Sequence, residues 1–247
     1  MRYELMRPAQ IRKAIDERWP VVLPLGVLEY HSEHLPVGMD TLAVVRCLEL
    51  LEQEMDLVIL PPFYYGAASL AVDKAERNGT VHVDSQALLP FARQVFMSLL
   101  KVGFRNIHTF VHHQSENFES GMPTDLAFRL ASKQVTMEYL EQTKGEGWWG
   151  DSSMATYYTE HDNPDANPFA WIQHHPLMDK EILASYPFDH AGEGETSLMM
   201  ALCPDTVDMA SRNHSHWFAE SADIASKATG DRGVAMILNY LRNLLKP

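Results

Sequence analysis

Three short apolar runs, with one helical segment between each pair, constrain the fold of this chain more than any other feature. The runs VVLPLGV at 21–27, DLVILPP at 56–62 and NIHTFVH at 106–112 are apolar and partly β-branched, as buried strands are. Apolar residues recur at helical spacing in the segments that start at Asp40 and Asp84. Strands that alternate with single helices predict an α/β fold with a mostly parallel sheet, covered by helices on both faces.

The rest of the chain is predicted to complete one domain over residues 1–247. A first helix is expected near 8–18, and two last helices near 195–203 and 233–245. The stretch from about 144 to 187 has tryptophans, several prolines and little periodicity, which predicts a long loop region. Because long loops inside a compact domain are often functional, we expect this region to be a lid over a site, or else a surface excursion or a subunit contact.

The composition narrows the classes of function. The chain has 247 residues, of which 46% are hydrophobic and 21% charged, as in ordinary globular proteins. Its net charge of -13 repels phosphate backbones and anionic membrane surfaces, so neither nucleic acid nor a membrane is an expected partner. Cys47 and Cys203 lie in apolar stretches, and the N-terminus lacks the apolar run of a signal peptide. We therefore expect a cytoplasmic enzyme without a structural disulfide.

The densest group of polar side chains follows the first apolar run. Five potential metal ligands lie within twelve residues, and they are Glu29, His31, Glu33, His34 and Asp40. In an open α/β sheet, ligands bind outside the carboxyl ends of the strands, which is where this segment begins. Carboxylate oxygens and imidazole nitrogens together suit zinc, manganese or iron. The segment therefore predicts a divalent-metal site.

Two further clusters are expected near the first. His112, His113 and Glu116 follow the third run, and the same edge rule brings them beside the first cluster. We expect one histidine of the adjacent pair to bind metal and the other to be a core residue. In the third cluster, Glu195 opens a helix, where the helix dipole alone could explain an acid, whereas His190 has no such explanation.

The motifs in these clusters resemble those of the creatininase (creatinine amidohydrolase) family. LPLGVLEYHSEHLPVGMDT is similar to the family's Pro-x-Gly-x-x-Glu-x-His-Gly-x-His-Leu-Pro run ending in Asp, and DHAGEGETS to its His-x-Gly-x-x-Glu-Thr-Ser motif. RNGTVHVDSQAL resembles its Gly-Thr-x-x-x-Asp segment, so the resemblance covers most of residues 20–210. It implies a three-layer α/β/α sandwich, a two-metal centre, hydrolysis of a C–N bond, often in a cyclic amide, and assembly into a homohexamer.

The resemblance also implies roles for individual residues. Glu29 and His113 would hold one metal ion, His31 and Glu195 the other, and Asp40 would bridge them. A metal-activated water would attack a carbonyl group of a small-molecule substrate.

Further residues would act on the substrate side of the metals. His190 or Glu116 would protonate the leaving group. Tyr30, Ser115 and Trp171 are expected to contact the substrate.

Departures from the family motifs leave the substrate open. Family members usually have Asn-Gly-His-Gly-Gly-Asn, or Asn-Gly-His-Tyr-Glu-Asn in creatininases, where this chain has VHHQSE at 111–116. Ser115 then falls at the position of the creatininase acid, and Glu116 takes that position only if the alignment slips by one residue. Tyr30 and Ser32 replace the usual Gln and Gly. Two alternatives therefore stay open: hydrolytic opening of a cyclic ketone or lactone, and an inactive metal-binding or ligand-sensing protein.

Overall fold

A four-stranded parallel sheet organises the chain. The computed structural model describes residues 1–161, 163–164 and 166–246. The strand order is β2-β1-β3-β4, and each neighbouring pair is parallel. The strands are β1 (Val21–Leu25), β2 (Val58–Ile59), β3 (Ile107–Val111) and β4 (Ile172–Pro176). The predicted α/β fold with a parallel sheet is confirmed.

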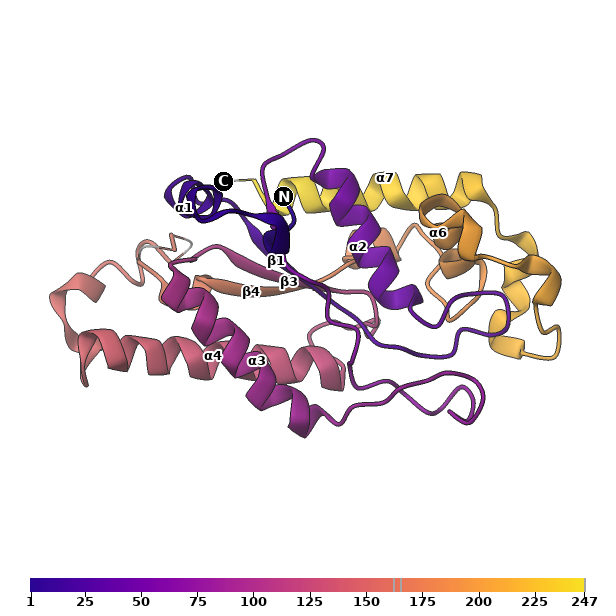
Figure 1. Ribbon diagram of the computed structural model, residues 1–247, viewed down its shortest axis with the longest axis horizontal. Helices are drawn as coiled ribbons and strands as arrows, with labels where there is room; N and C mark the ends of the chain where they lie inside the picture. Colours follow the sequence, from indigo (N-terminus) through magenta and orange to yellow (C-terminus); the bar gives the residue numbers. More distant parts are fainter. Residues whose placement is uncertain (162, 165, 247) are drawn as a thin grey trace.

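Helices form a layer on each face of this sheet (Figure 1). One layer consists of α2 (Met39–Leu51), α6 (Glu193–Leu202) and α7 (Lys227–Leu244), and the other of α3 (Ser85–Val102) and α4 (Pro123–Lys144). The remaining α-helices are α1 (Pro8–Asp16) and α5 (Lys180–Leu183). Short 3-10 helices span Tyr3–Leu5, Trp148–Gly150, Ser152–Met154, Pro168–Ala170, Pro204–Thr206, Met209–Ser211 and Trp217–Ile224.

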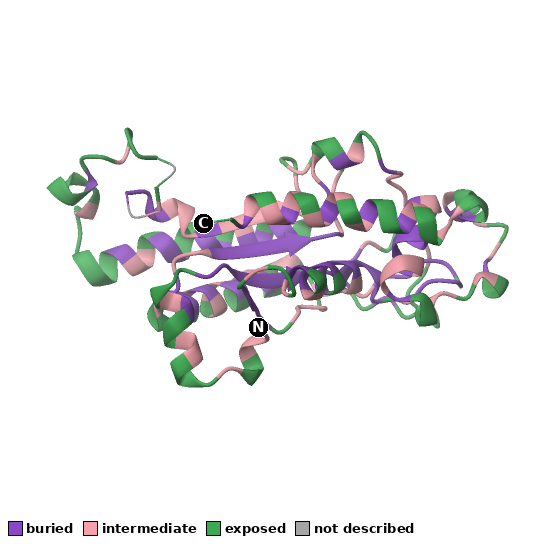
Figure 2. Cartoon of the chain, turned by 90° about the horizontal axis from the view of Figure 1, so that it is seen from above, coloured by how far each residue is buried: buried purple, intermediate pink, exposed green. Residues whose placement is uncertain are grey.

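The sheet separates two hydrophobic cores. Side chains alternate along a strand, so Val22 of β1 packs with α2, α6 and α7, while Val21 and Leu23 pack with α3 and α4. Figure 2 shows the consequence, with buried strands between helices that are exposed only on their outer faces. Because helices cover both faces of the sheet, a polar site can form at the ends of the strands.

The boundaries of α3 follow the sequence signals closely. Asp84 is the N-cap residue, and its carboxylate accepts a hydrogen bond from the backbone N–H of Gln86. Gly103 ends the helix with a φ of 120°, a conformation that favours glycine. Both signals are local, which explains why the sequence predicts this element so well.

The predicted loop region at 144–187 is wrong in part, because it contains β4 and α5. The sequence of β4, IQHHP, lacks the apolar character of the other strands. Its polar side chains find partners on β3 instead: His175 Nε2 lies 3.0 Å from His108 Nδ1, and His174 Nδ1 lies 2.8 Å from Thr109 Oγ1. His108 therefore serves to pair the two strands. Helix α4 is a second element that the sequence did not reveal.

Candidate metal centre

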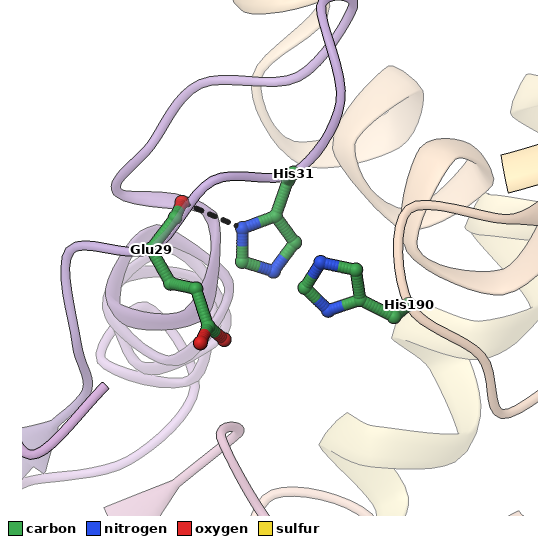
Figure 3. Close-up of side chains that lie close together, drawn as sticks. All are labelled: Glu29, His31 and His190. Carbon is green, nitrogen blue, oxygen red and sulfur yellow. Dashed lines mark hydrogen bonds between the residues drawn. The ribbon is translucent and has the colours of Figure 1, made fainter. Parts of the chain in front are cut away.

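Three segments distant in sequence meet at the carboxyl edge of the sheet. They are the loop that follows β1, the residues after β3, and the turn that enters α6. Figure 3 shows Glu29 and His31 from the first segment facing His190 from the third. The sheet thus brings the three sequence clusters together.

A close approach at Gly26 sets the path of the first segment. A Cβ atom at this position would lie 2.1 Å from Thr41 Oγ1 and 2.8 Å from the Thr41 backbone nitrogen. No side chain larger than hydrogen fits there without a shift of α2. The chain leaving β1 therefore packs directly on the first turn of α2, which carries Asp40.

Two groups of donor atoms share Asp40. In one, His113 Nδ1 lies 3.3 Å from Glu29 Oε2 and 3.9 Å from Asp40 Oδ2. In the other, His31 Nε2 lies 3.5 Å from both Asp40 Oδ2 and Glu195 Oε2. Ligand atoms that each lie about 2.0–2.2 Å from one tetrahedral ion are roughly 3.3–3.6 Å apart. Three of the four spacings lie in this range, and the 3.9 Å spacing between His113 and Asp40 slightly exceeds it.

Buried polar atoms in these groups have no hydrogen-bond partner. They include Glu29 Oε1, His31 Nε2, Asp40 Oδ2 and His113 Nε2. Leaving such atoms unpaired costs about 1–3 kcal/mol each, and more for charged groups. Divalent cations would satisfy the unpaired donor atoms that face one another, and mixed carboxylate and imidazole donors suit zinc, manganese or iron. The residues present therefore fit a two-metal centre.

The orientation of the His31 ring is set by its own loop. Its Nδ1 lies 2.9 Å from the backbone oxygen of Glu29, to which it donates a hydrogen bond, drawn as the dashed line in Figure 3. This bond assigns the proton to Nδ1 and leaves the lone pair of Nε2 directed at Asp40 and Glu195. The ring is therefore held in the tautomer that binds a metal.

Charges in the centre act strongly on one another. Burial by itself would lower the pKa of His31, but the carboxylates of Asp40 and Glu195 raise it above its ordinary value of 6.5. Burial would raise the pKa of Glu195, but His31 and His112 hold it well below its ordinary value. Without metal, the carboxylates thus favour the protonated form of His31, and the histidines favour the ionised form of Glu195.

His190 lies next to this cluster and is half-buried. Its Nε2 donates a hydrogen bond of 2.9 Å to the backbone oxygen of Tyr30, and its ring stacks on His31 with the centroids 4.3 Å apart. A ring nitrogen of His190 also lies within 4.8 Å of donor atoms of Glu29 and His31. The geometry suits proton transfer through Nδ1 and also permits metal ligation.

The chain matches a known protein family over most of its length. The family model described as "Creatininase: Creatinine amidohydrolase" matches residues 4–237. The chain belongs to the creatininase family. A creatinine amidohydrolase from Pseudomonas putida is 23% identical over 198 residues, which are 76% of this chain and 66% of that protein. A 3-dehydro-scyllo-inosose hydrolase from Thermotoga maritima is 26% identical over 103 residues, which are 42% of this chain and 32% of that protein.

The chain thus spans about two thirds of the length of the first relative and about one third of the second. Solved structures match over the full chain. A structure described as creatininase Mn has a TM-score of 0.73 and 16% identity, and the match covers 100% of this chain and 99% of that one. A mutant creatininase of the Zn-Zn type has a TM-score of 0.72 and 16% identity, with 100% and 98% covered. At these identities the likeness establishes the creatininase fold.

Within this creatininase-family fold, Trp171 is not where the sequence analysis expected it. It directly precedes β4, so it lies at the amino end of the strands, opposite the metal centre. The Arg105 guanidinium packs over the Trp171 ring at 4.6 Å, and the indole Nε1–H of Trp171 donates a hydrogen bond to the backbone oxygen of Pro164. Trp171 therefore does not contact a substrate bound at the metal centre of its own chain, contrary to expectation. The described part of 145–171 lies at the same far end, so the expected lid does not cover the centre of its own chain (Figure 1).

Three other expected substrate-side residues have distinct environments. Ser115 is half-buried, and its Oγ accepts a hydrogen bond from the backbone N–H of Asn117. Glu116 is exposed, unlike the buried carboxylates of the centre. Tyr30 is buried, and its hydroxyl donates a 2.7 Å hydrogen bond to Glu33. The structure therefore keeps Ser115 and Tyr30 nearer the interior than Glu116.

Sequence reasoning missed a group of rings beside His190. The ring of Phe218 meets His190 edge-on at 5.6 Å and stacks on His216 at 4.9 Å. Buried Arg212 fixes this segment by donating hydrogen bonds to the backbone oxygens of Ala219 and Glu220. Single aromatic residues in a polar segment gave no pattern to find.

Proposed function

We propose that this chain is a two-metal hydrolase that cleaves a C–N bond in a small amide, with cyclic amides as the preferred class. The observation that carries the proposal is the pair of donor groups that share Asp40, in which the buried atoms His31 Nε2 and Asp40 Oδ2 face each other and lack hydrogen-bond partners. Glu29 and His113 would hold one ion, and His31 and Glu195 the other. Bound divalent metals would polarise the substrate carbonyl and lower the pKa of a water molecule toward about 7.

His190 is the residue we assign to proton transfer. Its Nε2–H is committed to the backbone oxygen of Tyr30, so Nδ1 is the nitrogen free to accept and release a proton. Stacking on His31 keeps the ring beside the metal ligands. Tyr30 and Ser115 are proposed to contact the substrate, and Glu116 is the second candidate for the proton donor.

A second candidate reaction is the hydrolytic opening of a cyclic ketone or lactone. The matched 3-dehydro-scyllo-inosose hydrolase favours it, because an inosose is a cyclic ketone. The same polarised carbonyl would serve both reactions. A mutant creatininase complexed with creatine, with a TM-score of 0.72 to this chain, supports a small-molecule substrate in either case.

A turnover screen tests the proposal. The zinc, manganese and iron forms of the protein are assayed with cyclic amides, formamides, cyclic ketones and lactones, with Asp40→Asn as the matched inactive control. We expect turnover of a cyclic amide that the control lacks. Turnover of ketones or lactones alone would select the second candidate, and a metal-loaded protein inactive on every class would support the ligand-sensing alternative.

The assembly state is a further expectation. We propose that the chain forms a homo-oligomer, with a hexamer as the expected size, which light scattering after gel filtration measures. None of the described helices has both the length and the apolar character that crossing a bilayer requires.

A further inference from the structure

His112 occupies a position where the family motif quoted above has glycine. It follows β3 directly and is fully buried, next to the candidate ligand His113. Neither of its ring nitrogens makes a hydrogen bond of good geometry, although Nε2 lies 3.3 Å from Glu195 Oε1. A buried imidazole in this setting costs free energy unless it acts on a neighbour. Its neighbour here is a candidate metal ligand.

The two carboxylate oxygens of Glu195 have different surroundings. Oε2 accepts a 2.7 Å hydrogen bond from the backbone N–H of Ala191 and faces His31 Nε2 at 3.5 Å. Oε1 faces His112 Nε2. His112 thus contacts the oxygen of Glu195 that does not face His31. Contacts on both oxygens leave the carboxylate little freedom to rotate.

We propose that His112 is a positioning residue for Glu195. It holds Oε1 so that Oε2 points at the ion bound by His31 and Asp40, and so raises the affinity of that one site. The inference rests on the proposed two-metal centre. Partners that orient a ligating carboxylate typically contribute about 10–100-fold in metal affinity.

The geometry distinguishes this role from two simpler ones. His112 is outside the groups of donor atoms that lie within 4.8 Å of one another, so it is not placed as a direct ligand. A core histidine would be expected to bond the backbone, whereas the ring of His112 faces a carboxylate.

Only one of the two sites depends on this contact. Glu195 belongs to the group with His31 and Asp40, and the group with Glu29 and His113 does not include it. Removal of the His112 side chain should therefore lower the affinity for one ion and leave the affinity for the other unchanged. A general loss of folding would instead lower the affinity of both metal sites.

The test uses four variants of the full chain: His112→Leu, His112→Gln, Glu195→Gln and the double variant His112→Leu with Glu195→Gln. Zinc is titrated into metal-free protein in competition with a chelating indicator, which yields the two dissociation constants. Thermal unfolding of each metal-free variant reports folding separately. Glutamine keeps an N–H donor that can reach Glu195, and leucine does not.

We expect His112→Leu to weaken one zinc site by about 10–100-fold and to change the other by less than about threefold. His112→Gln should recover most of the loss. In the Glu195→Gln background, His112→Leu should have little further effect, because the two residues act as a unit.

Three results would overturn the inference. They are unchanged affinities in His112→Leu, an equal loss at both sites, and an undiminished effect of His112→Leu in the Glu195→Gln background. If the wild type itself binds no zinc, the proposed function fails and takes this inference with it. If the wild type binds two ions and His112→Leu binds both with unchanged affinity, only the inference fails.

Discussion

His31 Nε2 and Asp40 Oδ2 lie 3.5 Å apart at almost completely buried positions, and neither atom has a hydrogen-bond partner. His31 lies in the loop that starts at Gly26, and Asp40 lies in the first turn of α2, where this loop ends. Since Gly26 touches Thr41, the two ends of this loop are held against each other. The fold thus places two ligand candidates at a spacing that suits one bound ion.

The first prediction concerns that contact. Gly26→Ala adds a Cβ 2.1 Å from Thr41 Oγ1, so β1 and α2 must move apart. We expect the free energy of unfolding to fall by about 1–3 kcal/mol, the usual cost of overpacking, and metal affinity to fall with it. Urea denaturation and a zinc titration measure the two effects.

Gly38→Ala is the matched control for this prediction. Gly38 is the N-cap residue of α2, and its nearest neighbour to an added Cβ is 3.5 Å away, which is ordinary contact. Its effect should stay within about 1 kcal/mol. Equal destabilisation by the two alanines would show that the approach at Gly26 is not what shapes the loop.

The second prediction separates catalysis from metal binding at His190. His190→Asn removes the titratable nitrogen assigned to proton transfer, so turnover of the best substrate should fall by about 10²–10⁴. Metal content should stay at the wild-type level, because the two ligand groups that share Asp40 remain complete. Elemental analysis and a turnover assay on the same sample decide this. A variant that loses an ion would make His190 a ligand instead.

The third prediction is that the contribution of His31 to the stability of metal-free protein and the affinity of the protein for zinc respond to pH in opposite ways. The pKa of His31 is raised above 6.5 when folded, so its stabilising effect is present below pH 6.5 and is lost as pH rises through that raised value. The pKa of Glu195 is lowered below 4.5, so its effect is present above pH 4.5 and is lost as pH falls below it. Buried His108 and His174 have lowered pKa values and act in the opposite sense, so the contribution of His31 is measured as the difference between wild type and His31→Gln in metal-free protein. This difference should shrink as pH rises from 5.5 to 8.

Metal binding requires neutral imidazoles, so zinc affinity should instead increase as pH rises from 6 to 8, by up to about tenfold per unit for each proton released. Chemical denaturation in EDTA at pH 5.5 and pH 8, with zinc titrations across the same range, measures both trends. A destabilisation by His31→Gln that is larger at pH 8 than at pH 5.5 in metal-free protein would contradict the assigned direction of the His31 pKa.

The sequence predicted the elements that depend on local signals. The runs that became β1 and β3 are apolar and β-branched, and α3 begins and ends at a capping aspartate and a glycine. The metal candidates were found because they cluster at the ends of predicted strands. Local patterns and the edge rule for parallel sheets were sufficient for these features.

Features that depend on long-range contact were missed. β4 is polar in sequence, and its histidines are accommodated only because β3 offers His108 and Thr109 as partners. Trp171 was assigned to the site because it lies in an irregular segment, but the parallel register places it at the opposite end of the sheet. His112 was taken for a core residue because the sequence cannot show that it faces Glu195.

The number of divalent ions bound per chain, in the wild type and in Asp40→Asn, tests the central claim most directly. Asp40 belongs to both donor groups, so one substitution should weaken both sites while leaving the fold intact. Elemental analysis of metal-loaded, gel-filtered protein is expected to find two ions per chain in the wild type and fewer than one in the variant. Equal metal content in the two proteins, or no bound metal in the wild type, would contradict a centre built around Asp40.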